Sequence, residues 1–568
     1  MEVETDHVDD ESLLWRFLYL GIDKSVYRPS QCEITTEASI IDRLIQRGRG
    51  EAVVKWIKDS KDKCCKFYPL AYTLAICAKC NMSNVRQQAL EAIRYVCNTP
   101  SQLCMFLSYC AEIDEVECGC YLRNGSQRRY KRVGGIARQI RLRSWPRQFR
   151  RGIAQWYVSN PRYQEDIMLL AKHVTKYQCR NKFTHKRIIK ACHPKARNEE
   201  MNYIFCYIVK GLSKANQIFQ NVLTNGQIND RIKEYFTDFE SLKNVPDSDV
   251  DSVVNAINKW DLSWEHIPAK WLKHSRVWKT LLMREMPLMA LIRNLGKAGS
   301  MELLMPGSDE ENRVCERLTN IDIVNGSKLH PIDIISALTG YRRGEGCNER
   351  TWPINERIVK ALYKAYLNKL SVRPSTDKRL LLAINIKMKF DKNVVGKRWL
   401  TCKQAAAALA MMLTENERAA ETVTFGHLVR RFDFPRHDQG IEDVETALER
   451  IASIREEGNE PLSFSAPFIY ATGREEPFDA IILITDRVPG SKVQEIQSAF
   501  SNYKQHHPTA KCITVHFKHS ETTANPTDSS MLDVMGVDAY AVEIMQDFIL
   551  GYHEDMRNIL QDIVDLRI

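Results

Sequence analysis

The sequence lacks any apolar run near the roughly 18 residues that a membrane-spanning helix requires. Its first eleven residues are mostly acidic and contain no apolar core of the kind found in secretory signals. Hydrophobic residues make up 44% and charged residues 27% of the 568 positions, which is ordinary for a globular protein. We therefore expect an intracellular protein without a membrane span, located in the cytoplasm, with the nucleus as a second location.

Motifs of common enzyme classes are also missing. The sequence contains no Walker phosphate loop, no GxSxG, no HExxH and no recognisable pair of catalytic carboxylates. A metal-dependent nuclease would need carboxylates beside its basic surface, and residues 123–197 contain only Glu165 and Asp166. The sequence therefore predicts a protein that is not an enzyme.

Cysteine pairs at metal-binding spacing are scarce. Cys77 and Cys80 form the one CxxC pair among the seventeen cysteines, and residues 71–80 have a helical pattern. In a reducing compartment most cysteines act as small apolar side chains. We expect buried thiols, with a zinc site as the alternative.

Acidic residues are absent from two strongly basic stretches. Residues 123–151 contain eleven Lys or Arg, and residues 172–197 contain nine more and three His. The net charge of the whole chain is only +10, so this excess is local. A surface of one sign and this size repels itself unless a polyanion covers it.

Aromatic residues are interleaved with these cations. Cations that contact phosphates, together with rings that stack on unpaired bases, form a known pattern for single-stranded nucleic acid. The alternative for any one residue is a solvated cation or a core aromatic. The aromatic residues concerned are Tyr130, Trp145, Phe149, Trp156, Tyr157, Tyr177 and Phe183.

The chain divides into regions of different periodicity. Residues 1–11 are expected to form a disordered acidic tail. From about 37 to 370, apolar residues recur at spacings of three and four, which predicts helices. Antiparallel helix pairs, such as 71–80 with 84–97, suggest an α-solenoid of HEAT type.

Strands and helices alternate after residue 372. The apolar segments near 379–386, 480–486 and 512–517 are typical of buried strands, so a doubly wound parallel sheet is predicted. Ligands of such sheets bind at the carboxyl ends of the strands, here after Asn385 and Thr485.

Several short stretches carry a resemblance to a known family. They are Arg16-Phe-Leu-Tyr-Leu-Gly, Thr175-Lys-Tyr-Gln-Cys-Arg-Asn, Thr184-His-Lys, Glu285-Met-Pro-Leu and Met531-Leu-Asp-Val-Met-Gly. Through them the chain resembles the family of the Ro 60 kDa autoantigen, the TROVE-domain RNA-binding proteins. The resemblance implies a ring of HEAT-like repeats over residues 12–371 and a von Willebrand factor A-like domain over 372–568. It also implies that Y RNAs bind outside the ring and that 3′ ends of misfolded small RNAs enter its hole, in a ribonucleoprotein for RNA quality control.

The outer-surface contacts of the family match Lys176, Arg180 and His193. Lys176 and Arg180 are four residues apart, so we expect one helical face to present both to a phosphate backbone. Further RNA-contact candidates are eight more basic residues of the two stretches: Arg143, Arg147, Arg150, Arg151, Lys182, His185, Lys186 and Arg187.

Two features of the first basic stretch depart from the family. Pro146 stands where the family has Gly. The segment 121–140 is longer and more basic than the family pattern, and we hypothesise that it adds affinity for RNA.

The C-terminal domain departs from the family at its metal site. The family motif Asp-x-Ser-x-Ser follows the first strand, but the aligned residues here are Asn385, Lys387 and Lys389. Asp and Ser oxygens suit Mg²⁺, whereas a lysine ammonium group has no lone pair for a metal. Only Asp486 is retained as a plausible ligand, so we expect no metal and no other cofactor. We expect Lys387 or Lys389 to pair with Asp486.

The most specific interpretation is a non-enzymatic scaffold that binds small non-coding RNA by shape, phosphate contacts and a threaded single-stranded end. Its A-like domain would bind protein partners. The alternative is a protein-interaction scaffold whose basic stretches contact an acidic partner and bind no RNA.

Overall fold

The computed structural model describes most of the chain. The described residues are 10–21, 26–27, 38–61, 64, 66–117, 145–224, 228–346, 349–370, 375–387, 392–394, 397–417, 419–433, 446, 450, 461–518, 530–538 and 540–551. The predictions for Arg143, Lys389, Tyr130 and the basic insert 123–140 lie outside these residues.

The chain forms two compact units. The first comprises Met1–Gly21 with Glu33–Leu281, and the second comprises Ile22–Cys32 with Leu282–Ile568. The predicted boundary at 371/372 does not coincide with this division, since residues 282–371 belong to the same unit as the C-terminal sheet.

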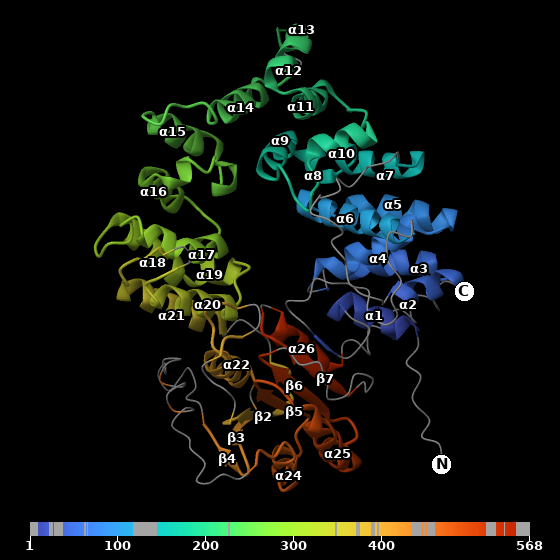
Figure 1. Ribbon diagram of the computed structural model, residues 1–568, viewed down its shortest axis with the longest axis vertical. Helices are drawn as coiled ribbons and strands as arrows, with labels where there is room; N and C mark the ends of the chain where they lie inside the picture. Colours follow the sequence, from blue (N-terminus) through green and yellow to red (C-terminus); the bar gives the residue numbers. More distant parts are fainter. Residues whose placement is uncertain are drawn as a thin grey trace, which may run out of the picture. The chain divides into compact units, whose positions relative to one another are not determined.

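The first unit is a stack of helices. From α1 to α10 the helices form a continuous stack in Figure 1, in which α4 packs on both α5 and α6, and α7 packs on α5 and α10. The helices are α1 (Asp10–Leu20), α2 (Ala38–Gln46), α3 (Gly50–Ser60), α4 (Phe67–Lys79), α5 (Ser83–Val96), α6 (Pro100–Glu117), α7 (Arg147–Val158), α8 (Pro161–Glu165), α9 (Ile167–Lys176), α10 (His185–Cys192), α11 (Glu199–Lys210), α12 (Leu212–Ile218), α13 (Gln220–Thr224), α14 (Asp230–Ser241), α15 (Val250–Trp260), the 3₁₀ helices η1 (Trp264–His266) and η2 (Trp271–Lys273), and α16 (Ser275–Met283).

Two residues of the predicted tail, Asp10 and Glu11, are helical, and residues 1–9 lie outside the described residues. Helix α1 begins at Asp10, whose carboxylate pairs with Arg43 at 2.7 Å and Arg47 at 2.6 Å. Glu11 pairs with Arg49 at 2.6 Å. These ion pairs, together with acidic residues in the first turn, favour a helix start at this point.

Short side chains define where the helices of the basic region begin. Asn160, Asp166, Thr184 and Asn198 each accept a hydrogen bond from a backbone N–H in the first turn of α8, α9, α10 and α11. Each cap contributes about 0.5–2 kcal/mol to the stability of its helix. Four helix starts within forty residues orient the cations between them.

The second unit combines helices with one sheet. Its helices are α17 (Leu288–Gly299), α18 (Asp309–Thr319), α19 (Ile321–Gly326), α20 (Pro331–Arg342), α21 (Glu356–Leu370), α22 (Cys402–Asn416), α24 (Ala466–Thr472), α25 (Gly490–His506) and α26 (Ala541–Leu550). Tyr366 of α21 donates to the carbonyl of Ala408 in α22 at 3.1 Å. This buried bond joins the helices that precede the sheet to a helix that covers it.

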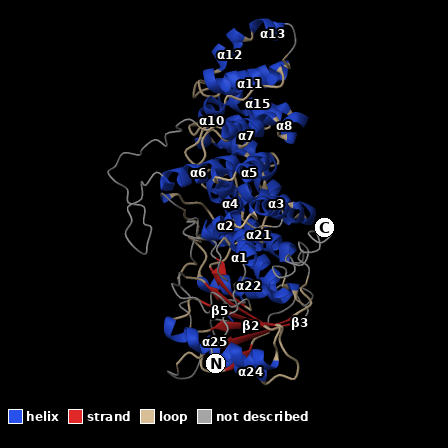
Figure 2. Ribbon diagram, turned by 90° about the vertical axis from the view of Figure 1, so that its right-hand side faces the viewer, coloured by secondary structure: helices blue, strands red, loops and turns tan. Residues whose placement is uncertain are grey.

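Within the described residues the sheet has seven strands, in the order β1-β7-β6-β5-β2-β3-β4. All neighbours pair in parallel except β3 with β4. The parallel core was predicted, but the antiparallel edge and the N-terminal strand β1 were not. The strands, drawn in red in Figure 2, are β1 (Val26–Tyr27), β2 (Arg379–Asn385), β3 (Ala419–Phe425), β4 (Val429–Arg431), β5 (Ala480–Thr485), β6 (Lys511–His516) and β7 (Met531–Met535).

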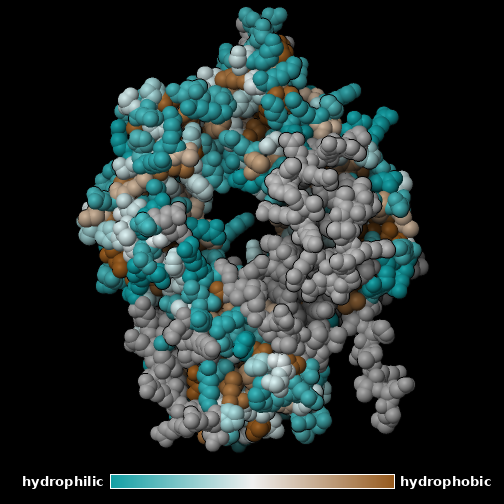
Figure 3. Space-filling view, viewed as in Figure 1, coloured by the Kyte–Doolittle hydropathy of each residue, from teal (hydrophilic) through white to brown (hydrophobic). Residues whose placement is uncertain are grey.

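The visible described surface is mainly hydrophilic, with apolar side chains scattered over it (Figure 3). Scattered exposed apolar residues are normal for globular proteins. Among helices within the described ranges, none combines the length and the apolarity needed to cross a bilayer.

Candidate nucleic-acid interface

Lys176 and Arg180 do not share a helical face. Helix α9 ends at Lys176, with Tyr177 as its C-terminal cap. Arg180 lies in a tight turn in which Arg180 and Phe183 exchange backbone hydrogen bonds of 3.0 and 2.8 Å. Asn181 and Lys182 at the centre of this turn have positive φ angles of 47° and 66°. The prediction of a common helical face is wrong because the helix ends before Arg180.

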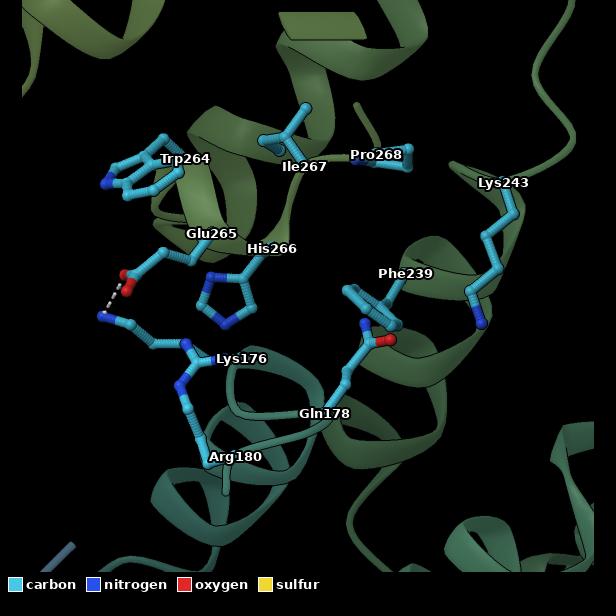
Figure 4. A pocket seen from close by; sticks show the side chains of 10 residues that line it. All are labelled: Lys176, Gln178, Arg180, Phe239, Lys243, Trp264, Glu265, His266, Ile267 and Pro268. Carbon is cyan, nitrogen blue, oxygen red and sulfur yellow. Dashed lines mark ion pairs between the residues drawn. The ribbon is translucent and has the colours of Figure 1, made fainter. Parts of the chain in front are cut away.

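Both cations nevertheless line one pocket of about 480 Å³. Figure 4 shows it between the end of α9, the end of α14 and the segment 264–268. The Tyr177 ring lies beneath both cations, with Lys176 Nζ 5.5 Å and the Arg180 guanidinium carbon 5.4 Å from its centroid. A shared aromatic platform, rather than helical spacing, places the two charges together.

His266 holds η1 against α9. Its Nε2 atom donates to the carbonyl of Lys172 at 3.3 Å, and Nδ1 accepts the backbone N–H of Ser263 at 3.2 Å. Burial lowers the pKa of His266 to about 4, so the ring is neutral at pH 7 with one donor and one acceptor nitrogen. The pocket wall is therefore joined to α9 through an uncharged ring.

The pocket is positive on balance. Lys176 Nζ pairs with Glu265 at 2.9 Å, and Lys243 Nζ pairs with Glu240 at 2.7 Å. Arg180 donates to the carbonyl of Cys179 at 2.9 Å and, within the described residues, pairs with no carboxylate. Its charge is thus the uncompensated one in this pocket.

His193 is the left-handed cap of α10. Its backbone has φ 49° and ψ 60°, and its N–H donates to Ile189 O at 2.9 Å. The side chain is exposed and forms no hydrogen bond with any described residue. An exposed imidazole with both nitrogens accessible can donate to a phosphate or stack on a base.

Helix α10 presents cations on its outer face. His185, Ile188, Ile189 and Cys192 are buried, which leaves Lys186 exposed on the opposite side. The next residue, Arg187, has its guanidinium carbon 5.6 Å from the centroid of the Phe183 ring and donates to the carbonyl of Lys182 at 3.4 Å. The exposed Lys182 precedes the helix, so the start of α10 carries three cations.

Helix α7 repeats this arrangement. Arg147, Arg150 and Arg151 are exposed near its N-terminus, and no described acidic side chain pairs with any of them. Cations in the first turns of a helix oppose the helix dipole, at a typical cost of about 0.3–1 kcal/mol each. Two helices that begin with exposed cations instead of acids present a surface suited to an anion.

The prediction that His185 contacts RNA is wrong. Its side chain is only 4% exposed, and its Nδ1 lies 2.8 Å from the Tyr157 hydroxyl. Burial lowers the pKa of His185 to about 4. The imidazole therefore joins α10 to α7 and does not face solvent in this conformation, because Thr184 starts the helix with position 185 inward.

The aromatic residues expected to stack on bases mostly form the core. Those on α7 recur at helical spacing on its buried face, and each is no more than 8% exposed. Tyr177 is half-buried beneath the two cations. The buried ones are Trp145, Phe149, Trp156, Tyr157 and Phe183.

Sequence reasoning missed the opposite wall of the pocket. Trp264, Glu265, Lys243 and Phe239 all lie more than forty residues beyond the end of the second basic stretch. Trp264 is 37% exposed. A tryptophan in a short polar segment between two amphipathic helices was the available signal.

The strand ends where the family pattern has its metal site contain an ion pair. Asn385 Nδ2 donates to Thr485 Oγ1 at 2.9 Å, so the two strand ends meet as predicted. Asp486 pairs with Lys518 Nζ at 3.0 Å, which corrects the prediction of Lys387 as its partner, while Lys389 lies outside the described residues. An ammonium group beside the one retained carboxylate does not fit a divalent cation.

The surroundings of the CxxC pair favour a structural role over zinc binding. Cys77 is fully buried, and burial raises the pKa of its thiol far above the usual value, which opposes formation of the thiolate that zinc requires. Among the described residues no group of three or more His, Cys, Asp or Glu side chains is arranged to hold a metal ion.

Comparisons with known proteins match nearly the whole chain. The TROVE domain model matches residues 2–399, and the Ro60 vWA domain model matches residues 379–549. A Caenorhabditis elegans protein named RNA-binding protein RO60 is 27% identical over 609 residues, which cover 96% of this chain and 88% of the relative. A Deinococcus radiodurans protein of the same name is 26% identical over 554 residues, which cover 96% and 93%. The crystal structure of the Deinococcus radiodurans RO (RSR) protein aligns with a TM-score of 0.78 and 24% identity, over 96% of this chain and 100% of that one.

Proposed function

Because this chain belongs to the TROVE-domain family, we propose that it is an RNA-binding protein whose interface lies on the first helical unit. The proposed interface comprises the pocket cations Lys176 and Arg180, the exposed His193, and the cationic starts of α10 and α7. The observation that carries the proposal is the run of exposed Lys and Arg without acidic partners at these two helix starts.

This interface would bind RNA mainly through its phosphates. Arg can contact two phosphate oxygens at once or stack on a base, whereas Lys acts as a point charge. A surface of this kind recognises the shape and charge of a folded RNA more than its sequence. The relatives named RNA-binding proteins support RNA as the polyanion.

The finer function follows the family resemblance. We propose that the ligands are small non-coding RNAs of the Y RNA type, in a ribonucleoprotein that takes part in RNA quality control. Threading of the single-stranded 3′ end of a misfolded RNA into a ring hole, protein partners of the A-like domain, and a cytoplasmic location with a nuclear fraction are parts of this proposal. We propose a scaffold without catalytic activity.

RNA recovered from the native protein by crosslinking and sequencing tests the proposal. A Lys176→Ala/Arg180→Ala/His193→Ala variant should lose at least one class of small structured RNA. Lys55→Ala/Lys58→Ala is the matched control, because it removes two exposed lysines from α3 of the same unit. RNA that stays on the triple variant would report a second site.

Two outcomes would contradict the proposal. If neither the wild type nor the control carries RNA above background, the cations serve another polyanion, and the protein-scaffold alternative takes first place. If complexes with proteins persist after ribonuclease treatment while no RNA is recovered, the acidic partner is a polypeptide.

A further inference from the structure

Trp264 differs from the other tryptophans of the chain. All ten lie in described residues, and Trp264 alone is exposed, at 37%, whereas the other nine are buried or half-buried. Within the described residues its indole has no ring contact and no cation–π partner, and its N–H donates to no group. An exposed indole without a partner offers a large flat surface to a ligand.

The position of Trp264 is also defined. It begins η1, and the hydrogen bonds of His266 join η1 to α9. Helix α9 is in turn joined to α14 by a buried hydrogen bond of 2.6 Å between Thr175 Oγ1 and Tyr235 OH. Such a buried framework holds the backbone of η1, and so the base of the Trp264 side chain, in place before a ligand arrives, which reduces the entropic cost of binding.

The indole stands at the rim of the cationic pocket. Figure 4 shows Trp264 next to the Lys176–Glu265 pair, with Arg180 extending into the same pocket from below. A volume of about 480 Å³ lies within the range of about 300–1,000 Å³ typical of small-ligand sites. A flat aromatic surface beside an uncompensated guanidinium group matches the two parts of a nucleotide, its base and its phosphate.

We infer that this pocket takes one unpaired nucleotide, whose base stacks on Trp264 and whose phosphate contacts Arg180. The inference rests on the proposed RNA-binding function and deepens it. It assigns to the interface a preference for RNA with an unpaired nucleotide over a continuous duplex. Stacking tolerates all four bases, so the preference concerns pairing state and not sequence.

Glu265 is consistent with this assignment. Its carboxylate pairs with Lys176 in the free protein and would repel a phosphate that reached the ammonium group. The base, which carries hydrogen-bond donors on its edge, can approach a carboxylate, whereas a phosphate cannot. The base is therefore expected on the Trp264–Glu265 side and the phosphate on the Arg180 side.

Two RNAs that differ only in pairing test the inference. One is a blunt 20-base-pair duplex, and the other is the same duplex with a bulge of three unpaired nucleotides. Dissociation constants are measured with the full-length chain for the wild type, Trp264→Ala, Trp264→Phe and Arg180→Ala at several salt concentrations. Tyr95→Ala is the control, since Tyr95 is a 47% exposed ring on α5.

Trp264→Ala should weaken binding of the bulged RNA by about 5- to 150-fold, the range measured for loss of base–aromatic stacking, and leave the duplex unaffected. The slope of log K against log salt should not change, because no cation is removed. Arg180→Ala should instead make that slope shallower for both RNAs. Trp264→Phe should retain most of the affinity, which shows that the indole is not needed for folding.

Other outcomes separate this inference from the proposed function. If the wild type binds both RNAs equally, or if Trp264→Ala weakens both by the same factor, the pocket does not select an unpaired nucleotide, although RNA binding stands. If the wild type binds neither RNA, the proposed function itself fails. If an acidic peptide competes for the site while RNA does not bind, the pocket serves a protein.

Discussion

Lys176 and Glu265 form an ion pair of 2.9 Å that joins the end of α9 to η1 across the pocket. The two side chains are 26% and 27% exposed, so water screens the pair and its net contribution to stability is at most about 1 kcal/mol. Its larger effect is on binding. The carboxylate neutralises an ammonium group that the proposed interface presents to a phosphate.

Removal of this carboxylate should therefore strengthen RNA binding. Glu265→Gln keeps the shape of the side chain and releases Lys176, so we expect the dissociation constant for a small structured RNA to fall about 2- to 5-fold. The slope of log K against log salt should steepen by the amount that corresponds to at most one additional phosphate contact. Asp251→Asn is the control, because it releases Arg276 from an ion pair on α15 and α16. Unchanged affinity in Glu265→Gln would contradict the electrostatic role.

Acid should destabilise the first unit through three histidines, of which His185 and His266 are buried and His173 is half-buried. Burial is the main cause that lowers the pKa values of His173, His185 and His266 to about 4, whereas an unfolded chain has a value near 6.5. Between these values the unfolded state binds more protons than the folded state, so the free energy of unfolding falls as the pH drops from about 6.5 to about 4. Above pH 7 these histidines contribute no pH dependence to the free energy of unfolding.

Denaturant unfolding at pH 7.5, 5.5 and 4.5 checks this expectation. His185→Gln removes one of the three groups, and glutamine cannot titrate. The number of protons taken up on unfolding, which sets the pH dependence, should therefore fall by up to one. A variant with the same pH dependence as the wild type would show that the pKa of His185 does not differ between the folded and unfolded states.

Two glycines of α17 are required by Trp352. A Cβ at Gly296 would lie 2.7 Å from the Trp352 ring, and one at Gly299 would lie 3.0 Å from the Cβ of the same residue. The ring cannot move freely, because its indole N–H donates to the carbonyl of Tyr341 at 2.9 Å. Gly296→Ala should lower the free energy of unfolding by about 1–3 kcal/mol. Gly326→Ala, whose Cβ meets no atom within 4 Å, should be close to neutral in the same measurement.

The strand ends of the sheet should not bind a divalent cation. Titration with Mg²⁺ or Mn²⁺, followed by calorimetry, is expected to reveal no site that depends on Asp486, because Lys518 already neutralises its carboxylate. A double-mutant cycle of Asp486→Asn and Lys518→Ala should give a coupling of about 0.5–3 kcal/mol in stability. Specific binding of either metal that Asp486→Asn abolishes would overturn the assignment.

The basic insert 123–140 should add to the electrostatic component of RNA binding. It carries six Lys or Arg and no acid. Replacement by a Gly/Ser linker of equal length should make the slope of log K against log salt shallower, by about 0.7–0.9 for each phosphate that the insert neutralises. An unchanged slope would show that these cations do not bind RNA.

The helical stack and the parallel sheet were predictable from the sequence because each depends on local periodicity. Apolar spacing of three and four determines which face of a helix is buried, and short fully apolar runs are typical of strands covered on both faces. The basic character of α7 and α10 was visible for the same reason, as a local run of Lys and Arg without acids.

The composition of the pocket was decided by tertiary packing. Periodicity does not indicate which distant segment meets the end of α9, so Trp264 and Glu265 were missed, and Lys518 was not identified as the partner of Asp486. The same holds for β1, whose residues Val26 and Tyr27 pair with Asp533 and Val534 near the other end of the chain. Contacts between segments far apart in the chain depend on the shapes of many side chains packed together, which a local pattern does not contain.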